Sequence, residues 1–253
     1  MRRHLEDAAD MTPIFAPGQK KAILFDMNGT LMDNHATRKI AFIKTLNEFT
    51  ARWAGGNDVS PEAVYTLYLK SLRKAKGRAK TDASEINHLR EAFSAMPFAV
   101  HDGFIRSFLD RFRQIREHSA EPFRNAHKVL KKLSQSYKLA IVTNGSRDRR
   151  LRQYRQLAIS GFIPEDRLFT PLNGKGRKPD PAFFRHVLRR MGNTPEQCVM
   201  VGDSWRKDII GAIRSGMDAV WINRAKKDMS MTRSGKSTII IVHRCERLTD
   251  LFG

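Results

Sequence analysis

The chain of 253 residues carries 46 Lys and Arg against 26 Asp and Glu, which gives a formal net charge of +20. Its composition, 41% hydrophobic and 28% charged, is that of a folded globular protein and excludes a wholly disordered chain. No apolar run approaches the about 20 residues of a membrane-spanning helix, and the N-terminus lacks the apolar segment of a secretory signal. The two cysteines exclude a disulfide framework and indicate a reducing cytoplasm.

The excess of positive charge is concentrated in three segments, at 73–80, 147–155 and 224–227. Because such a surface attracts anions, the expected partner is a small phosphorylated or otherwise anionic substrate. Nucleic acid would also fit the charge, but no zinc-binding spacing and no aromatic RNA-binding strand supports it. We expect no membrane partner, and these features do not indicate an oligomeric state.

The first third of the chain predicts an extension, one strand and a helical segment. Residues 1–19 are expected to form a flexible N-terminal extension. The apolar run Ala22–Phe25 predicts a buried strand. Between about 36 and 118 the pattern is helical, and in its clearest helix the apolar residues from Phe104 to Ile115 recur at a spacing of 3.6, which indicates a face packed in a core. The sequence therefore predicts a small helical bundle after the first strand.

From about residue 122 the pattern changes to alternating helices and strands. Helices are predicted at 124–135, 147–157, 180–191, 206–215 and near the C-terminus, and strands at 139–142, 199–201, 219–222 and 238–242. This alternation predicts βαβ units, so the expected fold class is α/β, with helices flanking a parallel sheet. The first strand joins this sheet if the helical bundle is an insertion.

Polar residues follow three of the predicted strands or lie between them, at the edge where open parallel sheets bind ligands. In chain order they are Asp26, Thr143, Asn144, Lys178, Asp203 and Asp208. Carboxylates can hold Mg²⁺, a hydroxyl beside backbone N–H groups at a helix start can bind an anion, and a lysine can neutralise charge. The set therefore predicts phosphoryl chemistry.

These residues lie in four segments, FDMNGTLMD, IVTNGS, GRKPDP and VGDSWRKDIIGAIRSGM, which resemble the four motifs of the haloacid dehalogenase superfamily. The resemblance spans nearly the whole chain. It implies a Rossmann-like core at 20–34 and 120–253, and an inserted all-helical cap domain of the family's C1 type at 35–119. In that family the cap closes over the site on the core.

The resemblance also implies a nucleophile and a metal site. Asp26 would attack phosphorus and form an aspartyl-phosphate. Mg²⁺ would be held by the carboxylates of Asp26 and Asp203 and by the backbone carbonyl of Asn28. Asp208 would bind the metal directly or orient a water on it.

The remaining motif residues are implied to bind the phosphate. Thr143 and the backbone N–H of Asn144 would contact phosphate oxygens, and Lys178 would hold the nucleophile and the transferred group. The expected function is a Mg²⁺-dependent, phosphatase-like hydrolase of this superfamily.

Position 28 departs from the family pattern, because most phosphatases of the family have Asp there to protonate the leaving oxygen and then to activate water. Asn28 cannot exchange a proton in this way. General acid–base catalysis typically contributes about 10²- to 10⁴-fold, so reduced or selective activity is expected. Restoring the acid by Asn28→Asp is predicted to raise turnover.

Four accounts of this departure remain open. A phosphatase could act on a good leaving group or take a proton from His35, His88 or His101. A 2-haloacid dehalogenase-like hydrolase would not need the second acid, although dehalogenases of the family generally lack the metal motif at Asp203. A degraded enzyme would bind phosphorylated ligands without efficient turnover. A catalytically weak anion- or nucleic-acid-binding protein would use the basic segment 73–80 as its surface.

Overall fold

The structure of the protein is a computed structural model. It describes residues 3–4, 14–15, 18–51, 60–74, 81–96, 99–171, 176–226 and 228–252. Most of the expected N-terminal extension, residues 75–80 of the first basic segment and residue 227 of the third lie outside these ranges. The chain divides into two compact units, unit 1 with Met1–Asp33 and Glu121–Gly253 and unit 2 with Asn34–Ala120. Within the described ranges, no helix is long and apolar enough to span a membrane.

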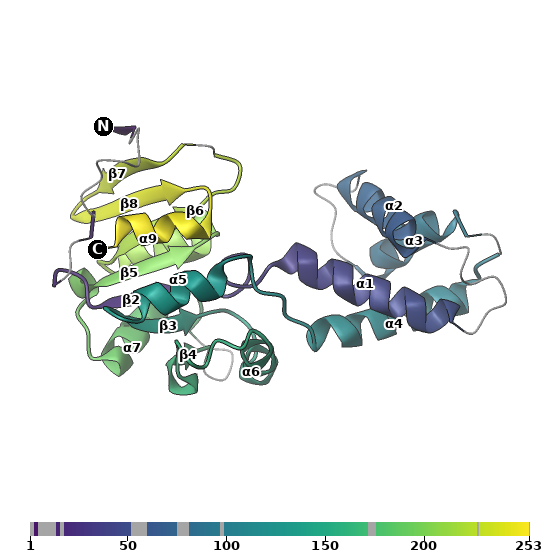
Figure 1. Ribbon diagram of the computed structural model, residues 1–253, viewed down its shortest axis with the longest axis horizontal. Helices are drawn as coiled ribbons and strands as arrows, with labels where there is room; N and C mark the ends of the chain where they lie inside the picture. Colours follow the sequence, from purple (N-terminus) through teal and green to yellow (C-terminus); the bar gives the residue numbers. More distant parts are fainter. Residues whose placement is uncertain are drawn as a thin grey trace. The chain divides into compact units, whose positions relative to one another are not determined.

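Unit 1 is built on one sheet, which contains eight strands in the described residues (Figure 1). In spatial order they are β1 (Arg3–His4), β7 (Ser230–Ser234), β8 (Ser237–Val242), β6 (Asp218–Ile222), β5 (Cys198–Gly202), β2 (Ala22–Phe25), β3 (Lys138–Val142) and β4 (Leu168–Phe169). The strands from β8 to β4 pair in parallel, so the expected α/β class is confirmed. The first strand of the chain joins this sheet between β5 and β3.

One edge of the sheet was not expected. β7 pairs antiparallel with β8, and β1 pairs antiparallel with β7. β7 and β8 are joined at a turn in which Gly235 has a φ of +59°, a conformation that favours glycine. The sheet is therefore mostly parallel, with an antiparallel addition beyond its last parallel strand.

Helices of unit 1 flank the sheet. They are α5 (Ala126–Leu133), α6 (Arg147–Gln156), α7 (Pro181–Met191), α8 (Ile210–Arg214) and α9 (Leu248–Leu251). In Figure 1, α5 and α9 lie in front of the sheet. α7 and α8 pack their apolar side chains, such as Phe184 and Ala212, against strand residues that include Leu24 and Met200 in one buried cluster. The predicted helix 206–215 begins instead as a π-helical turn, Trp205–Ile209, and α8 continues it.

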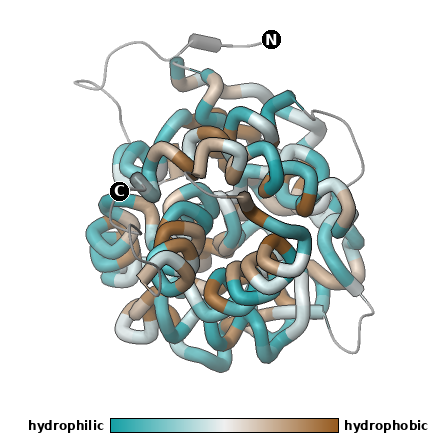
Figure 2. Tube along the Cα trace, turned by 90° about the vertical axis from the view of Figure 1, so that its right-hand side faces the viewer, coloured by the Kyte–Doolittle hydropathy of each residue, from teal (hydrophilic) through white to brown (hydrophobic). Residues whose placement is uncertain are grey.

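Unit 2 consists, in its described residues, of α1 (Asn34–Thr50), α2 (Pro61–Lys74), α3 (Asp82–Phe93) and α4 (Asp102–Glu117). In Figure 2, hydrophobic (brown) and hydrophilic (teal) stretches both occur along the helical turns, as expected of helices with one apolar face. The core prediction for α4 is confirmed, because Ile105, Phe108, Leu109, Phe112 and Ile115 are buried. The ring of Phe108 lies 4.9 Å from that of Phe93 and 5.2 Å from that of Phe42, so aromatic contacts join α4, α3 and α1.

The chain leaves unit 1 and returns to it through two adjacent segments. Met32 and Pro122 form an antiparallel β-bridge. The N–H of Asp33 donates to the carbonyl of Glu121 at 2.7 Å, and the N–H of Phe123 donates to the carbonyl of Leu31 at 2.9 Å. The two ends of the inserted segment are thus held side by side by backbone hydrogen bonds of the core.

Candidate active site

The sheet order places the ends of three neighbouring parallel strands, β5, β2 and β3, at one edge. A cavity of about 440 Å³ lies there. It is lined by every predicted site residue, namely Asp26, Asn28, Thr143, Asn144, Lys178, Asp203 and Asp208. Parallel strands place their carboxyl ends together, which explains why residues so far apart in the sequence meet.

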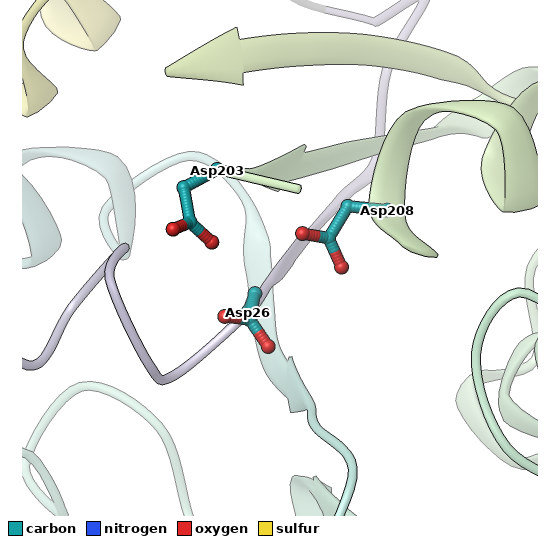
Figure 3. Close-up of side chains that lie close together, drawn as sticks. All are labelled: Asp26, Asp203 and Asp208. Atoms are coloured by element: carbon teal, nitrogen blue, oxygen red, sulfur yellow. The ribbon is translucent and has the colours of Figure 1, made fainter. Parts of the chain in front are cut away.

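Three carboxylates meet in this cavity, those of Asp26, Asp203 and Asp208 (Figure 3). Each offers an oxygen atom that lies within 4.8 Å of the other two. Asp26 directly follows β2, and its N–H donates to the carbonyl of Val201 on β5 at 2.9 Å. Carboxylate oxygens at such separations are the ligand set that Mg²⁺ prefers.

Lys178 lies between two of these carboxylates and is 3% exposed. Its Nζ donates to Oδ1 of Asp26 at 2.5 Å and to Oδ1 of Asp208 at 2.6 Å. Burial by itself lowers the pKa of Lys178, but the fields of Asp26 and Asp208 outweigh burial and raise it. The lysine therefore stays charged and holds both carboxylates in place.

The cluster carries an excess of negative charge. Three carboxylates meet one directly bonded ammonium, which leaves two negative charges among these four groups when all are ionised. Arg150 and Lys207 also line the cavity, but neither forms an ion pair with these carboxylates in the described residues. Burial raises the pKa of Asp208, although Lys178 acts against it, and burial together with Asp26 raises the pKa of Asp203. A bound divalent cation would balance this excess, so the residues fit such a cation in both ligand type and charge.

Two glycines make room for the carboxylates. A Cβ on Gly29, whose φ is +81°, would lie 2.2 Å from Oδ2 of Asp203. A Cβ on Gly202 would lie 2.4 Å from the side chain of Asp208. Nη1 of Arg224 also donates to the carbonyl oxygen of Gly29 at 2.7 Å and so fixes the loop that carries this glycine.

Asn144 connects the second motif to the third. Its Nδ2 donates to the backbone carbonyl of Lys178, and its Oδ1 accepts from the backbone N–H of Lys178, both at 3.0 Å. Thr143 is 1% exposed, and its N–H donates to the carbonyl of Phe169 on β4 at 3.0 Å. The Asn144 side chain thus positions the lysine loop.

A family model described as haloacid dehalogenase-like hydrolase matches residues 20–216. The chain belongs to the haloacid dehalogenase-like hydrolases.

Relatives of this hydrolase include a named phosphatase. Glyceraldehyde 3-phosphate phosphatase of Methanothermobacter thermautotrophicus is 29% identical over 204 residues, which cover 80% of this chain and 85% of that protein. Among solved structures, the HAD-hydrolase YfnB of Bacillus subtilis, bound to magnesium, has a TM-score of 0.59 at 20% identity and covers 91% of this chain and 97% of its own. A 2-haloacid dehalogenase of Pseudomonas syringae pv. Tomato DC3000 has a TM-score of 0.53 at 23% identity, with 92% and 97% covered. The two solved structures support the α/β fold described above. The family match and the phosphatase relative identify the chain as a hydrolase.

Three residues that line the cavity of this haloacid dehalogenase-like hydrolase were not predicted from the sequence, namely Arg150, Ser204 and Lys207. Arg150, on α6, is 9% exposed, and its Nη1 donates to Oδ1 of Asn28 at 3.0 Å. Its Nε donates to the carbonyl of Asn144 at 2.7 Å, and Nη1 also donates to Oε1 of Gln153 at 2.7 Å. Burial lowers the pKa of Arg150, as does Arg149, whereas the negative charge of Asp26 acts in the opposite direction. The sequence showed Arg150 only as one basic residue in the segment 147–155.

Two of the three histidines considered as proton donors have structural contacts in unit 2. Nδ1 of His88 lies 2.7 Å from Oγ of Ser71. His101 is the N-cap of α4, and its Nδ1 accepts from the N–H of Phe104 at 3.2 Å. His88 therefore has a contact between two helices, and His101 caps a helix, so each has a structural role.

Proposed function

We propose that the chain is a phosphatase that hydrolyses a small phosphorylated substrate through an aspartyl-phosphate on Asp26. The observation that carries this proposal is the buried arrangement of Lys178 between Asp26 and Asp208, with Asp203 within reach of both. Covalent phosphoryl transfer needs a carboxylate nucleophile, a fixed cation beside it and acidic ligands for Mg²⁺. The cavity supplies all three. With two cysteines in 253 residues, we further propose the cytoplasm as its compartment.

The residues of the chain divide the work of the first step. A carboxylate oxygen of Asp26 forms a bond to phosphorus while the bond from phosphorus to the leaving oxygen breaks. Lys178 holds Asp26 and neutralises charge on the transferred group. Thr143 and Asn144 line the cavity, and we propose that Thr143 and the backbone N–H of Asn144 bind phosphate oxygens there.

We propose Mg²⁺ as the cofactor, held by the carboxylates of Asp26, Asp203 and Asp208 and by the backbone carbonyl of Asn28. When bound, Mg²⁺ would supply a Lewis acid that withdraws charge from the phosphate oxygens. The presence of Asp203 in the metal motif argues against the dehalogenase alternative, because displacement of halide from carbon by Asp26 needs no metal ligand there. Asp208 pairs with Lys178 and would have that role in either reaction.

Unit 2 is proposed to be the cap that selects the substrate. It is helical in its described residues, has its own buried cluster and interrupts the core between β2 and β3. A nucleic-acid-binding role is supported by the charge of +20 alone, whereas the phosphatase role is supported by an organised site.

The test is release of phosphate from p-nitrophenyl phosphate and from a panel of sugar phosphates and nucleotides, with Mg²⁺ and with EDTA. We expect metal-dependent turnover that Asp26→Asn abolishes, because the amide keeps the shape but is not a nucleophile. Asp166→Asn is the matched control, since Asp166 is exposed in a turn of unit 1. Turnover that survives Asp26→Asn would contradict the proposal. Release of halide from 2-chloropropionate in EDTA would favour the dehalogenase instead.

A further inference from the structure

Arg150 is a buried guanidinium whose hydrogen-bond partners are all neutral. Among the described residues it donates to the Asn28 amide, the Asn144 carbonyl and the Gln153 amide, and it forms no ion pair with a carboxylate. Burying a charge without an opposite charge is costly. A group held in this way beside a cavity is suited to an anionic partner that arrives with the substrate.

The local sequence makes room for this arginine. A Cβ on Gly145, whose φ is +116°, would lie 2.8 Å from Nε of Arg150 and 2.9 Å from its Nη2. Gln153, one turn further along α6, is 2% exposed and accepts from Nη1. The guanidinium is therefore fixed on one side by hydrogen bonds and fitted against a glycine on another.

The chemistry of arginine decides how Asn28 is oriented. A guanidinium has five N–H donors and no acceptor, so it is the amide oxygen of Asn28 that faces Arg150. The Nδ2 group of Asn28 then remains as its donor. In the described residues neither Nδ2 of Asn28 nor Nη2 of Arg150 donates a hydrogen bond, and both side chains line the cavity.

We propose that Asn28 and Arg150 form a fixed pair of hydrogen-bond donors to the leaving oxygen, and that the enzyme therefore selects phosphates whose leaving oxygen departs as a weakly basic anion, such as acyl and aryl phosphates. This inference rests on the proposed phosphatase function and names its substrate class. It also assigns to position 28 a role that needs no proton.

Neither step of the proposed reaction needs a proton from an acidic side chain. In the first step Asp26 bonds to phosphorus, and the leaving oxygen departs with the bonding electron pair as an anion, stabilised by the two donors. In the second step the oxygen of water bonds to phosphorus, and the bond between phosphorus and Asp26 breaks. The carboxylate is regenerated, and both protons of the water leave with the product as dihydrogen phosphate.

The pair changes the expectation for Asn28→Asp. A carboxylate introduced there would meet the guanidinium of Arg150 at hydrogen-bond distance and form an ion pair with it. It would then be a poor proton donor. We therefore expect Asn28→Asp alone to leave the selectivity in place, and the double variant Asn28→Asp with Arg150→Gln to relax it.

The experiment measures kcat/KM for a series of aryl phosphates of increasing leaving-group basicity, with glycerol phosphate as the alkyl member. For the wild type we expect a fall of about 100-fold or more from p-nitrophenyl to phenyl phosphate, since the missing acid matters most for basic leaving groups. Arg150→Gln is expected to make the fall steeper, and the double variant to reduce it to about 10-fold or less. Arg152→Gln, an exposed arginine on the same helix, is the control for charge. Thermal unfolding of each variant checks that it is folded.

The outcomes separate the two proposals. A wild-type series with little dependence on the leaving group would overturn the pair and leave the phosphatase function standing. A relaxation as large for Asn28→Asp alone as for the double variant would show that Arg150 takes no part. If Arg150→Gln does not fold, the wild-type series still decides by the first criterion, and a relaxation to about 10-fold or less by Asn28→Asp alone would also overturn the pair. No turnover of any member with Mg²⁺ would overturn the phosphatase function and this inference with it.

Discussion

Gly29 and Asp203 approach so closely that a Cβ on the glycine would lie 2.2 Å from Oδ2 of the carboxylate. Gly29→Ala should therefore displace Asp203, and we expect phosphatase activity to fall by about 100-fold, the usual cost of a misplacement near 1 Å. Gly192→Ala is the matched control, because Gly192 also has a positive φ, +68°, but nothing lies within 4 Å of its Cβ position. Both variants carry the backbone strain of about 1–2 kcal/mol, so the larger loss of activity expected of Gly29→Ala reports its contact with Asp203.

Lys178→Met tests the charge balance of the site. The variant leaves Asp26 and Asp208 without their shared cation, and breaking a buried ion pair costs about 3–5 kcal/mol. We expect a lower melting temperature in EDTA, a larger stabilisation by added Mg²⁺ than in the wild type, and loss of activity. Lys207→Met, at an exposed lysine of the same cavity, should change the stability little. Equal melting temperatures for the two variants in EDTA would show that Lys178 does not neutralise the cluster.

Phe108→Ala tests the core of unit 2. Phe108 is fully buried, and its ring contacts those of Phe42 and Phe93. Removing a buried phenylalanine typically costs about 3–5 kcal/mol, which chemical denaturation measures as a lower free energy of unfolding. Ile40→Ala, at a residue 43% exposed, should cost no more than about 0.5 kcal/mol. A loss for Phe108→Ala as small as that of the control would mean that the aromatic cluster is not tightly packed.

Cys198 is predicted to be an unreactive thiol. It lies on β5 with no exposed surface, and burial raises its pKa to about 12. In a Cys245→Ser background, iodoacetamide should modify it only slowly at about pH 8.5, where an ordinary thiol is half ionised. The pKa of Cys198 is higher in the folded than in the unfolded protein, so the folded state favours the protonated thiol. This contribution to stability is fully present at a pH below the unfolded-state pKa. It is lost as the pH rises from there toward 12. Modification of the native protein as fast as in urea would contradict this burial.

The parallel part of the fold could be predicted because its strands are continuous apolar runs followed by polar residues. β2, β3, β5, β6 and β8 all have this pattern. β7 could not be predicted, because its sequence SMTRS is mostly polar and has no apolar run. The strand forms in the antiparallel part of the sheet, where hydrogen-bonded pairing with β8 stabilises it more than burial does. β4 has two residues, which is too short for any periodicity to appear.

The motif residues of the site could be predicted because the sheet brings the ends of β2, β3 and β5 together. Arg150 could not, because nothing in the segment RDRRLRQYR separates a buried arginine from its exposed neighbours. What distinguishes it is its position one turn into α6, above Gly145 and beside Asn28. That relationship exists only once α6 is placed against the first motif.

The bridge between Met32 and Pro122 has a consequence for how the protein can be altered. The hydrogen bonds around it hold the two ends of the inserted segment together, which offsets the entropy lost on closing that loop. The entropic cost of closing a loop also increases only slowly with the length of the loop. A short turn, or a helical insertion from another protein, could therefore be joined at residues 33 and 121 without opening the sheet. At this junction the inserted segment can therefore be exchanged while β2 and β3 stay intact.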